Sequence, residues 1–95
     1  MDVKINAVKF KADEKLTDFI TEKVSNLERH ASGLLGAEVT LSLDKPESDN
    51  NKIADIRLVV RGNDLYASKR AGSFEEAVML VIDALKPQVE KFKDK

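Results

Sequence analysis

The acidic and imidazole side chains are the first candidates for chemistry in this chain. His30 is the single histidine, and it follows an amphipathic segment where a cation suits the negative end of a helix. Asp18 and Glu22 lie one helical turn apart and could be paired carboxylates, but Lys15 and Lys23 flank them as on a solvated helix face. The sequence contains no glycine-rich phosphate loop and no Ser–His or Cys–His pair. It therefore predicts a protein that is not an enzyme, with no catalytic residues.

Metal and cofactor sites are equally poorly supported. The chain has no cysteine, so a thiolate metal site is excluded. Asp44, Glu47 and Asp49 share an acidic loop, but it lacks the central glycine and the terminal glutamate of a calcium-binding EF-hand. We expect no metal, no cofactor and no small-molecule substrate.

Basic side chains offer the remaining chemistry, which is the binding of phosphate groups. They gather near the ends of two predicted helices, and if those helices lie side by side the clusters would border one surface. Lysines near a helix C-terminus also stabilise the helix itself, which is the structural alternative. The predicted RNA-binding residues are Lys23, Arg29, Lys69, Arg70, Lys86, Lys91 and Lys93.

Composition argues against a non-specific nucleic-acid binder. The 95 residues include 16 basic and 17 acidic side chains, whereas such binders are usually basic overall. The charge is uneven, because residues 31–50 are mainly acidic and residues 51–72 mainly basic. No apolar stretch approaches the roughly 20 residues of a membrane span, and the N-terminus lacks a secretory signal. We expect a cytoplasmic protein with no membrane partner.

Hydrophobic periodicity predicts the elements that position these side chains. Alternating apolar residues predict a strand near residues 3–7, and an apolar stripe over 16–27 predicts a helix. This helix would begin at the N-cap Asp13, carry Arg29 and His30 in its last turn, and stop at Ser32–Gly33. Three further strands follow, with Val39, Leu41, Leu43, Ala54, Ile56, Leu58, Val60, Leu65 and Ala67 facing inward. A loop over 44–51 and a hairpin turn at 62–64 join them.

A second helix is predicted from a capping box at Ser73–Glu76 and an apolar stripe from Phe74 to Phe92. The stripe continues past Pro87, which predicts a kink rather than a helix end. The order β-α-β-β-β-α predicts an α+β fold, a two-layer sandwich in which both helices cover one face of a four-stranded sheet. Residues 1–95 would form a single domain. The other face offers one aromatic, Tyr66, which argues against a base-stacking platform there.

These segments together resemble the ribosome hibernation promoting factors, a family also called ribosome-associated inhibitors or sigma-54 modulation proteins. The resemblance covers essentially the whole chain and is carried by residues 16–30, by Leu65-Tyr66-Ala67-Ser68, and by residues 73–93. It implies a fold similar to that of double-stranded RNA-binding domains. It also implies basic helix residues that contact ribosomal RNA, at the positions of Lys23, Arg29, Arg70, Lys91 and Lys93.

The resemblance further implies binding to the small ribosomal subunit where messenger and transfer RNA would sit, and inhibition of translation in stationary phase or stress. Asn26, Ala84 and Pro87 stand where relatives often have basic residues, and Glu75 stands where a tyrosine is frequent. The length is that of the short form, which in some bacteria acts with a separate ribosome modulation factor. The alternative function is a protein-interaction module that modulates a sigma-54-type transcription factor.

Overall fold

The computed structural model describes residues 1–45, 47 and 49–93, with the side chain of Lys93 outside the described part. The chain forms the predicted β-α-β-β-β-α order, with one short 3₁₀ segment, η1, after the first helix. The elements are β1 Asp2–Ala7, α1 Glu14–Ser25, η1 Asn26–Arg29, β2 Gly36–Leu43, β3 Lys52–Val59, β4 Leu65–Ala71 and α2 Phe74–Lys93.

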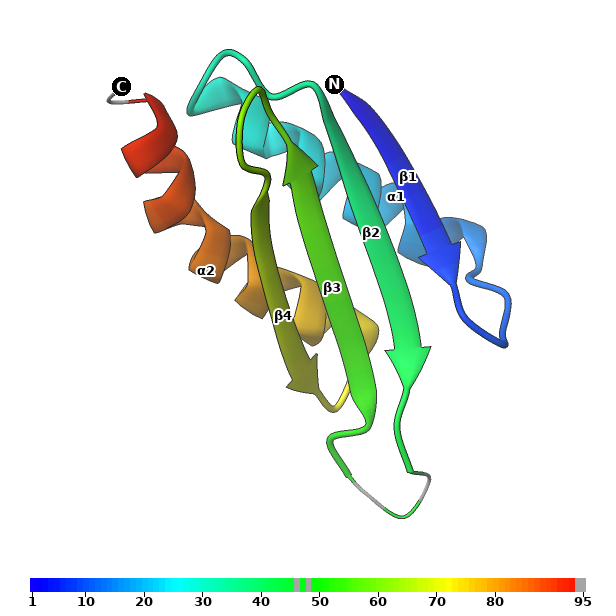
Figure 1. Cartoon of the computed structure of the whole chain (residues 1–95). Coiled ribbons are helices and arrows are strands. Elements are labelled where there is room, and N and C mark those ends of the chain that lie inside the picture. The colour runs from blue at the N-terminus through cyan, green and yellow to red at the C-terminus, as the bar shows by residue number, and fades with distance from the viewer. Residues whose placement is uncertain (46, 48, 94–95) are drawn as a thin grey trace.

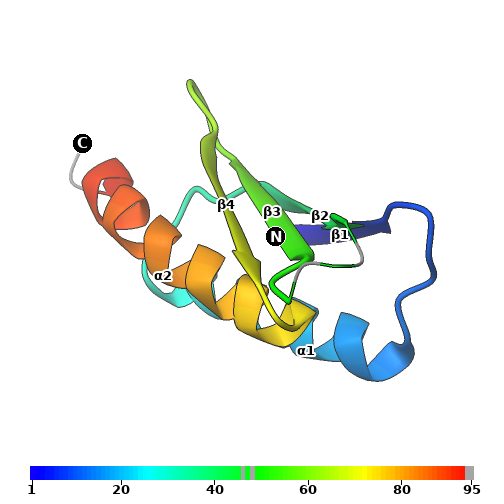
Figure 2. The same ribbon diagram turned by 90° about the horizontal axis from the view of Figure 1, so that it is seen from below.

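The four strands make one sheet in the order β1-β2-β3-β4 (Figure 1). β1 is parallel to β2, and the other two pairs are antiparallel. Both helices lie against the same face of the sheet and leave the other face open (Figure 2). The predicted α+β fold with two layers is therefore confirmed. None of the helices in the described residues is long and apolar enough to cross a membrane.

The core forms where the apolar side of the sheet meets the apolar stripes of the helices. Ala54, Ile56 and Leu58 are fully buried, because alternate residues of β3 point toward the helices. Ile20 of α1 and Val81 of α2 are also fully buried against them. Within the described part of the chain, no polar or charged residue is buried. Every charged side chain described below is therefore at the surface.

Both helices begin at the predicted caps. A side-chain oxygen of Asp13 accepts a hydrogen bond of 2.8 Å from the backbone N–H of Leu16. The Ser73 hydroxyl accepts one of 3.1 Å from the N–H of Glu76, which is the Ser73 half of the predicted capping box. These bonds satisfy donors that the first turn of a helix leaves free.

The end of the first helix differs from the prediction. The α-helix stops at Ser25, and η1 carries the chain on to Arg29, so Arg29 and His30 do not lie in its last turn. The backbone N–H of His30 bonds the carbonyl of Leu27 at 3.1 Å, the shorter repeat of a 3₁₀ turn. Gly33, with φ of 93°, makes the turn toward β2 in a conformation that favours glycine.

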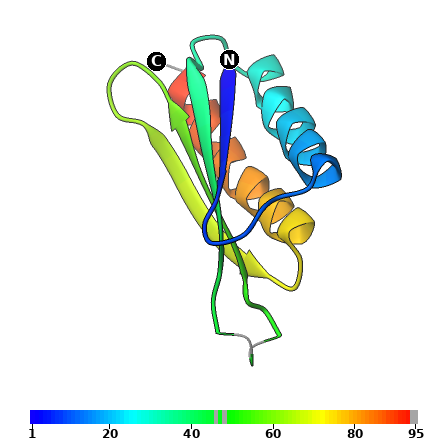
Figure 3. The ribbon, with the colours of Figure 1, turned by 90° about the vertical axis from the view of Figure 1, so that its right-hand side faces the viewer.

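One residue in the hairpin of β2 and β3 also differs from the prediction. Leu43 was expected to face the core but is 49% exposed. It pairs with Lys52 at the far end of the hairpin, which extends beyond the two helices (Figure 3). The alternation of β2 is intact there, but no helix covers its apolar side.

α2 continues through Pro87 to Lys93, so the predicted single helix is confirmed, while the kink stays a prediction. The residue after the proline joins α2 to the sheet. The side-chain amide of Gln88 bonds the backbone of Tyr66 in β4, at the edge of the sheet.

Candidate nucleic-acid interface

Three of the predicted RNA-binding residues meet in a hollow between the two helical segments. We call this site the helix hollow; it is lined by Lys23, Asn26, Leu27, Arg29, His30, Met79, Ile82 and Lys86. α1 and η1 supply one wall and α2 supplies the other. The predicted side-by-side arrangement of the helices is therefore present for Lys23, Arg29 and Lys86.

The helix hollow combines an apolar floor with a cationic rim. Leu27 and Ile82 are buried core residues, and Met79 is 36% exposed on the surface. The ammonium of Lys23 lies 5.7 Å from the centroid of the Phe19 ring, a cation–π distance that orients the side chain. The ammonium of Lys86 lies 3.6 Å from the Asp83 carboxylate one turn earlier, a surface ion pair of small energy.

The charge in the lining of the helix hollow is positive. The lining includes two lysines and one arginine but no carboxylate. The nearby Glu28 carboxylate pairs instead with the α-amino group of Met1, at 3.2 Å. Side chains of this kind on a hollow surface suit the phosphate groups of a nucleic acid.

The structure does not bring Lys69 and Arg70 together with this site. Both lie in β4, where neighbouring residues point to opposite faces of the sheet. Arg70 is opposite Ile53 in the register, and its guanidinium lies 2.7 Å from the Asp44 carboxylate. Lys69 is opposite the buried Ala54, so it belongs to the helix-covered face, near the start of α2. The prediction that all the basic clusters border one surface is wrong for Arg70.

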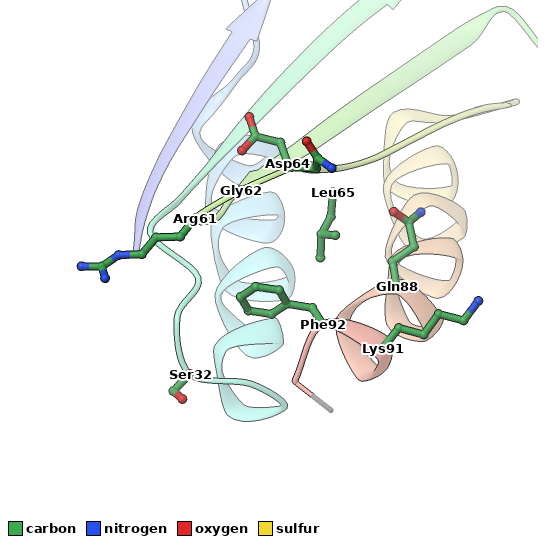
Figure 4. Close-up of a pocket in the computed structure, with 9 residues that line it drawn as sticks. Ser32, Arg61, Gly62, Asp64, Leu65, Gln88, Lys91 and Phe92 are labelled. Atoms are coloured by element: carbon green, nitrogen blue, oxygen red, sulfur yellow. The ribbon is translucent and has the colours of Figure 1, made fainter. Parts of the chain in front are cut away.

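Lys91 also lies apart from Lys86. Five residues of an α-helix turn the side chain by about 140°, so the two lysines point to different sides of α2. Lys91 lines a second hollow, the turn hollow, with Ser32, Arg61, Gly62, Asn63, Asp64, Leu65, Gln88 and Phe92 (Figure 4). Lys93 is the last residue of α2, and its side chain falls outside the described residues.

On the open face of the sheet, several charged side chains interact with one another. The hydroxyl of Tyr66 donates a hydrogen bond of 3.0 Å to the Asp55 carboxylate, and this bond raises the pKa of Tyr66 above its ordinary value of 10.0. The Arg57 guanidinium lies 3.6 Å from the Glu38 carboxylate. Arg57 and Arg70, which lie in the strands of this face, are therefore both paired with carboxylates.

Of the residues that line the two hollows, sequence reasoning assigned only Lys23, Arg29, Lys86 and Lys91 to RNA binding. Met79 was not placed at a site, although it is seven residues before Lys86, which puts both on one side of a helix. Arg61 was not placed at a site either, and no local pattern relates it to Lys91. Among the described residues, no group of three or more His, Asp or Glu side chains could hold a metal ion.

Known proteins share the sequence pattern over the full fold. The model of the family described as "Sigma 54 modulation protein / S30EA ribosomal protein" matches residues 3–95. The chain is 32% identical over 80 residues to a ribosome hibernation promoting factor of Klebsiella oxytoca, covering 84% of this chain and 80% of that protein. It is 30% identical over 95 residues to one of Azotobacter vinelandii, covering 100% of this chain and 85% of that protein.

Solved structures share the architecture. The N-terminal domain of Thermus thermophilus Protein Y has a TM-score of 0.82 at 24% identity, covering 97% of this chain and 99% of that domain. A ribosomal subunit interface protein from Coxiella burnetii has a TM-score of 0.82 at 18% identity and full coverage of both chains. At these identities the structures support the fold. The family match over nearly the whole chain, together with the relatives of 30% and 32% identity, shows that this protein belongs to the sigma 54 modulation protein / S30EA ribosomal protein family.

Proposed function

We propose that this protein is a ribosome hibernation factor, which binds the small ribosomal subunit in the cytoplasm and inhibits translation when growth stops. The helix hollow carries the proposal, because it gathers Lys23, Arg29 and Lys86 without a carboxylate in its lining. The curated relatives are named ribosome hibernation promoting factors, which supports the same role.

The proposed mechanism is occupation of the channel for messenger and transfer RNA. Ribosomal RNA phosphates would contact the cationic rim of the helix hollow, while Met79 and Ile82 give the floor an apolar surface. No step of covalent chemistry is needed, because the bound domain excludes the RNA ligands sterically.

The charge of the chain predicts how this binding responds to salt. Since the net charge is −1, long-range attraction to RNA is weak and affinity must come from local ion pairs. Each phosphate contact adds about 1 to the magnitude of the slope of log affinity against log salt. A short-range, salt-sensitive interaction is therefore expected.

The test compares two double variants in co-sedimentation with small ribosomal subunits across a salt series. Lys23→Gln with Lys86→Gln removes two cations of the helix hollow and should lower the magnitude of the slope by about 2. Lys4→Gln with Lys11→Gln removes the same charge from exposed positions outside both hollows and is the matched control. Circular dichroism checks that both fold.

Inhibition of translation in vitro should fall in the hollow variant and stay unchanged in the control. Equal affinity and equal salt slope in the two variants would show that the helix hollow is not the RNA site. A parent protein that does not sediment with ribosomes at all would instead favour the modulation of a transcription factor.

A further inference from the structure

The turn hollow is a second site with no residue in common with the helix hollow. It is an open hollow of about 710 Å³ between Ser32, the connection from β3 to β4, and the last turns of α2 (Figure 4). Gln88, Lys91 and Phe92 line it from α2, whereas Met79, Ile82 and Lys86 of the same helix line the helix hollow. The two hollows therefore lie on different sides of α2.

The floor of the turn hollow is aromatic and held in place. Phe92 is half-buried, and its ring edge lies near Gly33, where a Cβ would be 3.4 Å from two ring atoms. Leu65, also half-buried at the start of β4, extends the apolar floor. A ring fixed in this way at the surface can stack on a flat ligand.

The rim of the turn hollow carries two cationic side chains, those of Arg61 and Lys91. Neither Arg61 nor Lys91 is ion-paired with another residue of the described chain. Figure 4 shows the Arg61 side chain extending away from the Phe92 ring on one side and the Lys91 side chain extending away from it on the other. The one carboxylate of the lining, on Asp64, accepts a hydrogen bond of 3.2 Å from the N–H of Val60. A complementary ligand has a flat group that stacks on the ring and an anionic group on each side of that flat group.

We propose that the turn hollow binds one unpaired nucleotide of an RNA strand. The base stacks on the Phe92 ring, and the phosphates on its two sides pair with Arg61 and Lys91. Aromatic stacking combined with cations along the backbone is the usual chemistry of single-stranded RNA recognition. An acidic peptide would satisfy the cations but would leave the aromatic floor without a flat partner. The proposal rests on the proposed function only in that the ligand is RNA.

The chain offers a clean reporter for this site, because it has no tryptophan. A Phe92→Trp variant places a single indole on the floor of the turn hollow. The probe is a single-stranded oligoadenylate of roughly six nucleotides, a length within the range of known stacking sites. We expect saturable quenching of the indole fluorescence by this probe, and little quenching by an RNA duplex of the same length, whose bases are already stacked.

The cations are tested in the same background. Arg61→Gln with Lys91→Gln should weaken the quenching affinity at least about tenfold and lower the magnitude of its salt slope by about 2. Lys4→Gln with Lys11→Gln is again the matched control and should leave the affinity unchanged. In the parent background, Phe92→Leu should weaken binding of a labelled probe roughly 5- to 150-fold by anisotropy, the range for loss of one stacked base. This anisotropy measurement tests the stacking on Phe92 even if the Phe92→Trp variant does not fold.

The proposal is overturned if the probe binds the parent and the Phe92→Leu variant equally. It is also overturned if Arg61→Gln with Lys91→Gln leaves the affinity and the salt slope unchanged. Displacement of the probe by polyglutamate at equal charge concentration, with no preference for RNA, would assign the site to acidic peptides and also overturn it. Failure here is distinct from failure of the proposed function, because the variants of the helix hollow leave Arg61, Lys91 and Phe92 untouched. Ribosome binding without stacking at Phe92 would contradict this inference alone.

Discussion

The side chain of Gln88 holds the backbone of Tyr66 through both ends of its amide. Its Nε2 donates to the Tyr66 carbonyl oxygen at 2.9 Å, and its Oε1 accepts from the Tyr66 N–H at a longer 3.4 Å. β4 is an edge strand, so this amide takes the place of a neighbouring strand at one residue. The same contact fixes the end of α2 against the sheet immediately after Pro87, and with it the position of Lys91 and Phe92.

Replacing Gln88 by alanine should therefore destabilise the protein although the residue is only half-buried. We expect a loss of about 1 kcal/mol in the free energy of unfolding, the typical net value of such hydrogen bonds. For a domain of this size, that lowers the melting temperature by about 4–8 °C. Leu80→Ala, at an exposed position of the same helix, is the control and should change stability by less than about 0.5 kcal/mol. Equal melting temperatures of the two variants would mean that the amide contact contributes nothing.

Pro87→Arg should make α2 more regular. Proline cannot donate the backbone hydrogen bond to the carbonyl of Asp83, and its ring crowds the preceding turn, which costs about 3 kcal/mol or more inside a helix. Pro87 is exposed, so an arginine can be accommodated. We expect a higher midpoint of urea unfolding with an unchanged m-value. A clearly lower midpoint would show that the fold depends on the conformation that proline imposes.

Tyr66 should titrate above its ordinary pKa of 10.0, because its hydroxyl donates to the Asp55 carboxylate. Since the neutral phenol is favoured in the folded state, this contribution to stability is present below pH 10 and is lost as the pH rises through the raised pKa. Tyr66 is the only tyrosine, so the ultraviolet absorbance of tyrosinate reports it alone. Asp55→Asn should lower the pKa toward 10.0, and an unchanged titration would contradict the assigned cause.

The open face of the sheet should contribute little to ribosome binding. Arg57 is paired with Glu38, and its removal leaves both hollows intact. Arg57→Ala should bind small ribosomal subunits with nearly the affinity of the parent and change stability by less than about 0.5 kcal/mol. Co-sedimentation at one salt concentration measures this. A large loss of affinity in the folded variant would show that the open face of the sheet, and not the helix side, is the binding surface.

The elements and the core could be predicted from the sequence because the repeats of strands and helices are local. The inward positions of Ile56 and Leu58 follow from alternation over a few residues, and Val81 and Leu85 follow from the spacing of one helical face. The caps at Asp13 and Ser73 are equally local, since each bonds a backbone group three residues away. The parallel β1–β2 pair follows from the helical connection between the two strands.

The composition of the sites was decided by the tertiary structure. Lys69 and Arg70 are adjacent in sequence, but the pairing of β4 continues through both and sends them to opposite faces of the sheet. Arg61 lines a hollow with Lys91 because the turn after β3 and the last turns of α2 border the same hollow, and no periodicity relates residues that far apart. A local repeat determines which side of an element is buried. The place where two elements meet depends on side-chain packing and on hydrogen bonds between distant segments, such as the bond of Gln88 with Tyr66. These tertiary contacts distribute the cations between two hollows instead of one surface.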